Sequence, residues 1–314
     1  MIHSPICDLL GIRYPLFQGG MAWVADGKLA AAVSEAGGLG IIGAGNAPAS
    51  YVEEQIALAR SRTNAPFGVN VMLLSPFADE VAQLLAEQKV AVVTTGAGNP
   101  SKYMDLWLGA GIKVIPVVAS GAMAKLMTRV GASALIAEGG ESGGHIGDLS
   151  TMVLIPQVCD ATNLSVIAAG GIADGRGAAA AFMLGACGVQ MGTRFLVAEE
   201  CGIHETYKEK VLKAGDIATL VTGRRLGHAV RSLRTPFARN YWKAEYSSMP
   251  DEDLEQLGTG ALRLAVQEGD IQNGCFLAGE IASMVNKRQT AAEIIREIMD
   301  ETEQTLRGGA AWLE

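Results

Sequence analysis

Residues 134–145 read A-L-I-A-E-G-G-E-S-G-G-H, and the predicted fold depends on this stretch. The apolar run at 134–137 is typical of a buried strand. Four glycines, two acids and a serine lead to His145, and a helical pattern starts near Ser150. A strand, a loop and a helix in this order predict an α/β protein, with His145 on a loop of the kind where binding and catalytic residues collect. The alternative for this segment alone is a tight turn with a solvated histidine.

The same unit recurs about every 25 residues through roughly the first 200 residues. Strands are predicted at 15–18, 40–42, 67–71, 91–94, 113–118, 134–137, 166–169 and 188–191. Helical patterns between them predict parallel strands joined by right-handed crossovers. Eight such strands favour a closed (β/α)8 TIM barrel over an open doubly wound sheet.

The alternation stops after residue 202. Charged helical patterns at 207–214 and 251–268 flank a basic stretch. An amphipathic pattern at 289–308, with Ala292, Ile295, Ile298 and Met299 on one face, predicts the eighth barrel helix. We therefore predict two units. Residues 1–202 and 276–314 form a barrel that binds a cofactor, and residues 203–275 form a mostly helical lid or substrate subdomain inserted after strand eight.

Composition excludes several classes of protein. The net charge of −8 argues against a nucleic-acid partner, and no run of about 18 apolar residues predicts a membrane span. The first residues lack a signal-peptide pattern. Five scattered cysteines, an odd number without a C-x-x-C pair, indicate reduced thiols and a cytoplasmic location. The four histidines lack metal-ligand spacing, so no metal site is expected.

Two glycine-containing loops predict a phosphate site. Gly170 and Gly171 follow the seventh predicted strand, and Gly192 and Thr193 follow the eighth. In barrels these two loops often donate backbone N–H groups to a phosphate. The alternative is that both are ordinary strand-end turns. No Walker motif or G-x-G-x-x-G unit after a strand is present, so a Rossmann nucleotide site is not expected.

The phosphate loops favour FMN among phosphate-bearing cofactors. Pyridoxal phosphate needs a lysine at a strand end, and the only lysine there, Lys113, starts its strand. FMN needs a backbone-lined slot and polar partners, but no covalent anchor. The further residues predicted to bind it are Gln18, Gly19, Gly20, Met21, Asn70, Glu138, Gly143 and Gly144.

Seven motifs, in order along the chain, resemble the FMN-dependent enoyl-acyl-carrier-protein reductase II family, within the wider nitronate monooxygenase (2-nitropropane dioxygenase-like) superfamily. They are Y-P-L-F-Q-G-G-M-A-W-V (14–24), A-G-G-L-G-I-I-G (36–43), P-F-G-V-N-V-M-L-L (66–74), V-V-T-T-G-A-G-N-P (92–100), A-E-G-G-E-S-G-G-H-I-G (137–147), I-A-A-G-G-I-A-D-G (167–175) and Q-M-G-T-R-F (190–195). The likeness continues at G-H-A-V-R (227–231) and covers nearly the whole chain. G-G-H-I-G at 143–147 resembles the reductases, whereas nitronate oxygenases typically carry G-G-H-R-G. Ser142 stands where the family pattern has alanine.

The resemblance implies reduction of trans-2-enoyl-acyl-carrier-protein in fatty acid elongation, with hydride passing from NADH or NADPH through N5 of FMN. It implies that His145 is catalytic and protonates the α-carbon, a task that suits an imidazole. The alternative is that His145 only orients the flavin. The resemblance also implies a monovalent cation, whose position the sequence does not give.

Two other functions remain open at this point. One is a nitronate monooxygenase, which would share the flavin residues, and the other is a barrel that binds flavin or an acyl ligand without turnover. Three roles are open for Glu138 and Glu141, which could hold a ribityl hydroxyl, fix the tautomer of His145 or cap the following helix.

The stretch 224–243 is basic and contains no acid. Its side chains are predicted either to contact an acidic acyl carrier protein, through Arg224, Arg225, Arg231 and Arg234, or to form a solvated helix face. A homodimer is expected because this is the commonest oligomer.

Overall fold

Eight parallel strands close into a barrel in the computed structural model, which describes residues 2–312. In barrel order they are β1 (Leu16–Gln18), β2 (Leu39–Gly43), β3 (Gly68–Met72), β4 (Val92–Gly96), β5 (Lys113–Val118), β6 (Leu135–Glu138), β8 (Val166–Ala169) and β9 (Gly188–Met191). Strand β9 pairs with β1 and closes the ring. The predicted TIM barrel is confirmed, and each predicted strand lies within two residues of the observed one.

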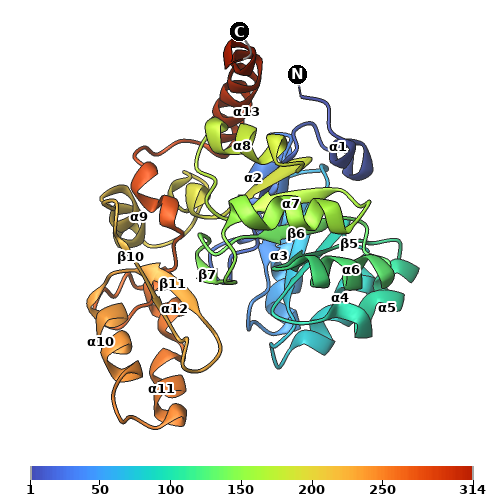
Figure 1. Cartoon of the computed structure of the whole chain (residues 1–314). Helices are drawn as coiled ribbons and strands as arrows, with labels where there is room; N and C mark the ends of the chain where they lie inside the picture. The colour runs from blue at the N-terminus through green and yellow to red at the C-terminus, as the bar shows by residue number, and fades with distance from the viewer. Residues whose placement is uncertain (1, 313–314) are drawn as a thin grey trace.

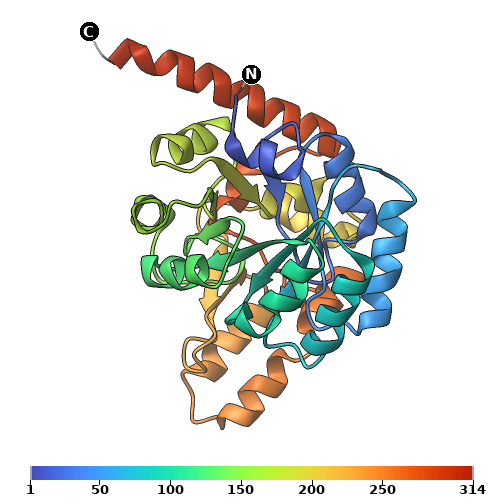
Figure 2. The same ribbon diagram turned by 90° about the vertical axis from the view of Figure 1, so that its right-hand side faces the viewer.

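Helices surround this barrel, as Figures 1 and 2 show. They are α2 (Gly27–Glu35), α3 (Ala49–Arg60), α4 (Ala78–Gln88), α5 (Met104–Gly109, preceded by η1, Pro100–Tyr103), α6 (Gly121–Arg129), α7 (Thr151–Ala161), α8 (Gly175–Met183) and α13 (Ala291–Gly308). Four start at a side chain that accepts from first-turn N–H groups, namely Asp26, Ser120, Asp174 and Thr290. A short helix that the sequence did not predict, α1 (Pro5–Leu10), places Ile6 and Leu10 in the cluster that fills the barrel.

Helix α13 is the late eighth helix of the barrel. It begins with a capping box between Thr290 and Glu293, which satisfies N–H groups at the helix start. Its buried face carries Ile294, Ile295, Ile298 and Met299. The expectation that Ala292 belongs to this face is wrong, because Ala292 is exposed and Ala291 is buried.

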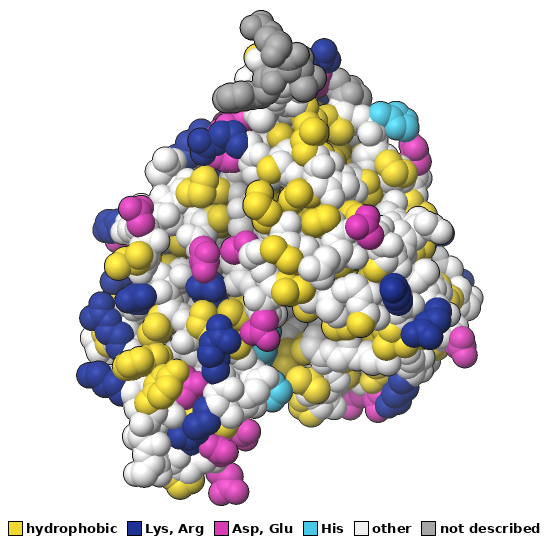
Figure 3. All heavy atoms as spheres, viewed as in Figure 1, with side chains coloured by type: hydrophobic (Ala, Val, Ile, Leu, Met, Phe, Trp, Pro, Cys, Tyr) yellow, Lys and Arg dark blue, Asp and Glu magenta, His cyan; other side chains and the backbone are white. Residues whose placement is uncertain are grey.

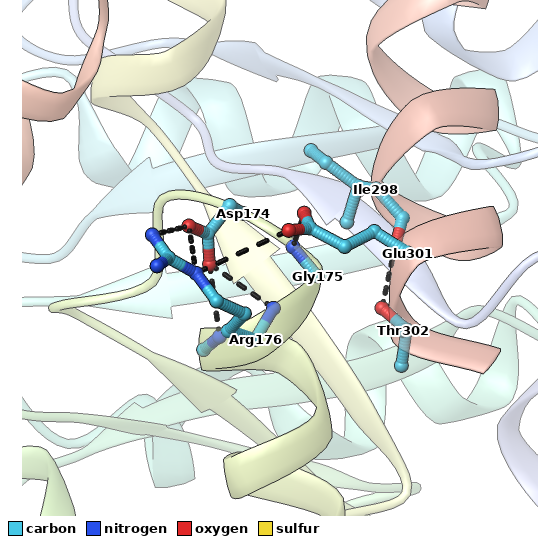
Figure 4. A network of polar contacts seen from close by, with 7 residues as sticks. Asp174, Gly175, Arg176, Ile298, Glu301 and Thr302 are labelled. Atoms are coloured by element: carbon cyan, nitrogen blue, oxygen red, sulfur yellow. Dashed lines mark hydrogen bonds and ion pairs between the residues drawn. The ribbon is translucent and has the colours of Figure 1, made fainter. Parts of the chain in front are cut away.

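A close contact fixes α13 against α8, shown in Figure 4. The Gly175 N–H donates to the Glu301 carboxylate at 2.7 Å, and a Cβ atom at Gly175 would lie 2.5 Å from the Glu301 Cβ. Arg176 pairs with Asp174 and also lies 4.0 Å from Glu301. Glycine at position 175 is therefore required by the approach of the two helices.

The segment between β9 and α13 is mostly helical, as predicted, but it also contains a hairpin. Its elements are η2 (Thr193–Val197), α9 (Glu205–Leu212), β10 (Thr219–Thr222), β11 (Val230–Leu233), α10 (Pro236–Glu245), α11 (Asp251–Gly258), α12 (Ala261–Gln267) and η3 (Glu280–Met284), and η4 (Gly309–Trp312) follows α13. Gly260, in the left-handed region at φ 78°, separates α11 from α12, which the sequence predicted as one helix. The division into two units stays a prediction, and residues 1, 313 and 314 lie outside the described residues.

Among the described residues, no helix is both long and apolar enough to span a bilayer.

Candidate active site

A cavity of about 510 Å³ opens at the carboxyl ends of the barrel strands. Its volume lies within the range of small-molecule sites, about 300 to 1,000 Å³. The walls come from the ends of all eight barrel strands and the loops after them, and from six residues of the later segments, Tyr207, Leu262, Leu277, Ala278, Gly279 and Ile281. This is the end of a barrel at which active sites are built.

The structure brings nearly all predicted site residues into this cavity. Those that line it are Gly19, Gly20, Met21, Asn70, Glu138, Gly143, Gly144, His145, Gly170, Gly171, Gly192 and Thr193. Gln18 is the exception. Its side chain is fully buried, with Nε2 donating to the Ile41 carbonyl at 3.2 Å and Oε1 accepting from the Ile41 N–H at 3.3 Å. Gln18 therefore braces β1 against β2, and its amide is not available to a ligand in the cavity.

Some glycines of the cavity wall are required by packing alone. A Cβ atom at Gly20 would lie 2.3 Å from the Asn70 Cβ, and one at Gly170 would lie 2.7 Å from the Gly139 carbonyl oxygen. Gly171 differs, because a Cβ atom there would approach nothing closer than 3.4 Å. Its φ of 70° requires glycine, and its backbone faces open space in the cavity.

Thr193 connects the predicted phosphate loop to the end of the inserted segment. Its hydroxyl accepts from the Gly279 N–H at 2.8 Å, which leaves the O–H proton free to donate. Glu280 N–H donates to the Glu141 carbonyl at 2.9 Å, and a Cβ atom at Gly143 would lie 2.6 Å from the backbone carbon of Ala278. Residues 276–280 are called here the strap. They hold the predicted phosphate loop at 192–193 to the loop between β6 and α7 (residues 139–150), which carries His145 and is called here the histidine loop.

The strap could not be predicted, because its apolar run has no helical or strand period. The Tyr207 hydroxyl anchors it by donating to the Leu277 carbonyl at 2.6 Å, and the Leu233 N–H donates to the Phe276 carbonyl at 2.8 Å. Met72 and Gly96 also line the cavity without having been predicted. These two could have been found, because they end β3 and β4.

His145 lies on a strand that was also not predicted. Gly144 and His145 form β7, which pairs antiparallel with β11 in a three-stranded sheet of order β10-β11-β7. His145 is opposite Val230, and the Ile146 N–H donates to the Ala229 carbonyl at 3.0 Å. The backbone around the histidine is thus fixed by the inserted segment rather than by the barrel.

The pKa of His145 lies below its usual value. The main cause is desolvation, because the protein surrounds the ring even though its edge is exposed at the cavity mouth, and the nearby His228 lowers the pKa further. The lowered pKa favours the neutral imidazole. A neutral imidazole still presents one N–H donor and one acceptor nitrogen.

Glu138 is the last residue of β6, and this partly buried residue lines the cavity. Desolvation raises its pKa to about 7, against a smaller lowering by the Ser142 hydroxyl, which donates to Oε1 at 3.3 Å. The raised pKa favours the protonated carboxyl, which can donate as well as accept. Ser142, where the family pattern has alanine, supplies its only hydrogen bond among the described residues.

Glu141 has the third of the roles considered for it. Its carboxylate accepts from the Thr151 N–H at 2.9 Å and from the Thr151 hydroxyl at 2.8 Å. Ser150, the residue before α7, makes no side-chain capping bond. Glu141 therefore caps α7 and holds the histidine loop at the start of this helix.

Most of the predicted carrier-contacting arginines are used within the chain. Arg225 donates to three backbone carbonyls between residues 245 and 249, and Arg234 donates to the Thr219 carbonyl at 2.7 Å. Arg231 is largely buried. Arg224 is exposed, and basic side chains gather over the inserted segment at the left of Figure 3.

Comparison with known proteins gives the family. A model described as nitronate monooxygenase matches residues 3–84 and 75–301. The chain belongs to the nitronate monooxygenase family. It is therefore an oxidoreductase of this family, whose members are FMN-dependent flavoproteins.

Within this family the chain is similar to proteins of different activities. The structure of FabK from Thermotoga maritima has a TM-score of 0.97 and 48% identity, and the match covers 99% of this chain and 100% of that chain. An octahydro-indene-carboxyl-CoA dehydrogenase of Mycobacterium tuberculosis is 38% identical over 74% of this chain and 67% of its own length. A probable nitronate monooxygenase of Staphylococcus saprophyticus is 30% identical over 97% of this chain and 99% of its own length.

Proposed function

We propose that this protein is an NAD(P)H-dependent enoyl-acyl-carrier-protein reductase that uses FMN. The observation that carries the proposal is a glycine-walled cavity at the barrel mouth with a single histidine, His145, on its wall. FabK is an enoyl-acyl-carrier-protein reductase II, and the likeness to it along almost the whole chain supports this activity within the family. G-G-H-I-G at 143–147 supports it as well.

The cavity fits FMN by its chemistry. Gly171, Gly192 and Thr193 offer backbone N–H groups and a free hydroxyl proton where a barrel holds phosphate. Gly19 and Gly20 give the slot a wall without side chains, and Asn70 and Glu138 provide polar partners. Bound FMN would supply hydride transfer between the reduced nicotinamide and the β-carbon of the enoyl thioester.

The protein's own residues would bind the acyl chain and deliver a proton. Leu262, Leu277 and Ile281 give the cavity an apolar side, which suits an acyl chain. His145 on the mouth would donate a proton from its imidazole to the α-carbon as negative charge develops there. The relative with a carboxyl-CoA substrate in its name supports an acyl thioester as the substrate class.

The partner that carries the substrate is a further proposal. An acyl carrier protein is acidic, and Arg224 is the member of the predicted set best placed to meet it, because both Arg224 and its ion-pair partner Asp148 are exposed. Arg225, Arg231 and Arg234 are less suited, because their guanidinium groups already donate to backbone carbonyls within the chain. A homodimer, a cytoplasmic location and a monovalent cation also remain proposals.

A nitronate monooxygenase is the second candidate, and full-length similarity to a probable enzyme of that name favours it. One comparison separates the two. The purified protein is given crotonyl thioester with NADH or NADPH in the absence of oxygen, and separately an alkyl nitronate with oxygen. The proposed function requires saturated thioester in the first reaction at a rate well above nitronate oxidation, and the reverse ranking would refute it.

A further inference from the structure

Two of the four histidines face each other at the cavity mouth. The ring centroids of His145 and His228 are 6.4 Å apart, and the ring planes are nearly perpendicular at 87°. Pairing of β7 with β11 holds them there, because His145 lies opposite Val230. Histidine side chains are visible at the notch between the barrel and the inserted segment in Figure 3. The backbone therefore fixes the spacing of the two rings.

The two rings have different surroundings. Both side chains are exposed, but His145 lines the cavity, whereas His228 lies on the loop between β10 and β11 and is not part of the cavity wall. The separation of the rings is too long for a direct hydrogen bond but allows one bridging water. The pair thus extends outward from the cavity wall, and His228 is the member farther from the cavity.

Two ion pairs of the β10–β11 hairpin, one to the histidine loop and one to the strap, nearly balance the charge around the rings. Arg224 lies 3.5 Å from Asp148, beyond His145 in the chain, and both side chains are exposed. On the other side, Arg231 lies 2.9 Å from Glu280 of the strap. Glu141 is the remaining charged group of the histidine loop, and it caps α7. Since each arginine has an acidic partner, the most direct electrostatic influence on either ring is the other ring.

We propose that His228 is a proton relay for His145, which makes it a positioning residue for proton supply and not a group that touches the substrate. The inference rests on the proposed function. His145 donates a proton to the α-carbon and is left one proton short. Protonated His228 then gives a proton to the bridging water, the water passes one to His145, and His228 regains a proton from bulk water. Only N–H, O–H and C–H bonds form and break, and no electrons are transferred.

The test compares His228→Gln with a matched control, His3→Gln, which changes an exposed histidine near Asp8 at the start of the chain. Both are studied as the FMN-loaded protein. A relay acts between turnovers, so the first turnover of reduced His228→Gln protein with crotonyl thioester should keep the wild-type rate. Steady-state kcat should fall about tenfold, less than the about 10² to 10⁴ lost with a direct proton donor. Added imidazole buffer should restore part of it.

A second measurement does not depend on activity. In protein labelled at histidine carbons, the His145 titration followed by NMR should move to higher pH in His228→Gln, because a neighbour that lowers the pKa is gone. The relay is overturned if kcat and the His145 titration match wild type, or if the first turnover slows as much as kcat, which is the mark of structural damage. If wild-type protein itself fails to reduce the thioester, the proposed function is wrong. If the His145 titration is also unchanged in His228→Gln, the interaction between the two histidines is wrong as well.

Discussion

The guanidinium of Arg231 donates to the backbone carbonyl of Gly140 at 2.9 Å, which ties β11 to the loop that carries His145. The same side chain, only 12% exposed, pairs with Glu280 of the strap. Desolvation lowers its pKa, and Glu280 opposes this. One arginine thus connects the inserted segment, the histidine loop and the strap.

Arg231→Met should therefore loosen the histidine loop. The loss of hydrogen bonds from a charged, largely buried group should lower the free energy of unfolding by about 1 to 3 kcal/mol. Enoyl reduction should fall further than flavin reduction by NAD(P)H, since the loop positions His145. Urea unfolding and the two half-reactions measure both effects. Arg234→Met is the control, because Arg234 is an exposed arginine only three positions later in the chain. Equal losses in the two variants would deny Arg231 a special role.

Gly171→Val should yield colourless protein. A Cβ atom at this position would lie 3.4 Å from the Glu141 Cβ, so a valine would crowd the cavity wall where the phosphate is predicted to bind. The backbone at φ 70° also disfavours any residue with a Cβ. Gly111→Val controls for backbone strain, because Gly111 has φ 82° and no atom within 4 Å of a built Cβ. Absorbance of the purified proteins gives the flavin content. A yellow Gly171→Val protein with one FMN per chain would show that this loop does not hold the phosphate.

His145→Gln should retain FMN and flavin reduction but lose most enoyl reduction, by a factor of about 10² to 10⁴. In wild type, the proton-dependent step should slow as pH rises through the His145 pKa. Because desolvation and His228 lower that pKa, the midpoint should lie below about 6.5, the ordinary imidazole value. Anaerobic rapid mixing over a pH series measures the step. An unchanged rate in His145→Gln would assign the histidine to flavin orientation only.

Glu138→Gln tests the buried carboxyl. Its folded-state pKa is raised from 4.5 to about 7, so its contribution to stability is complete below pH 4.5 and is lost as pH rises through about 7. Gln carries no charge, so the variant should gain on wild type with rising pH, by up to about 3 kcal/mol at pH 8. Urea unfolding at about pH 5 and about pH 8 measures the difference. A constant difference between the two pH values would place the Glu138 pKa at its ordinary value.

The barrel could be predicted from the sequence because its strands, such as 113–118 and 166–169, are short apolar runs at a regular spacing. The position of the cavity could also be predicted, because residues after strand ends must meet at one end of a parallel barrel. It could not predict β7. Two residues have no periodicity, and their partner β11 follows more than 80 residues later.

Side-chain use within the site was harder to predict than position. Gln18 ends β1 at the cavity end of the barrel, yet the register of β1 on β2 directs its amide to Ile41 and away from the cavity. The arginines of the basic stretch resembled a docking face because charge alone was visible. The backbone carbonyls that these arginines bind lie in the inserted segment. Its hairpin was not predicted, so these contacts could not be predicted either.

The central claim is that hydride passes from a nicotinamide to an enoyl thioester in this cavity. The most direct test follows the flavin absorbance of the purified protein in the absence of oxygen. NADH or NADPH should bleach it, and crotonyl thioester added next should restore it with one equivalent of saturated thioester formed. Bleaching without recovery on addition of the thioester, followed by recovery with oxygen and a nitronate, would contradict the claim.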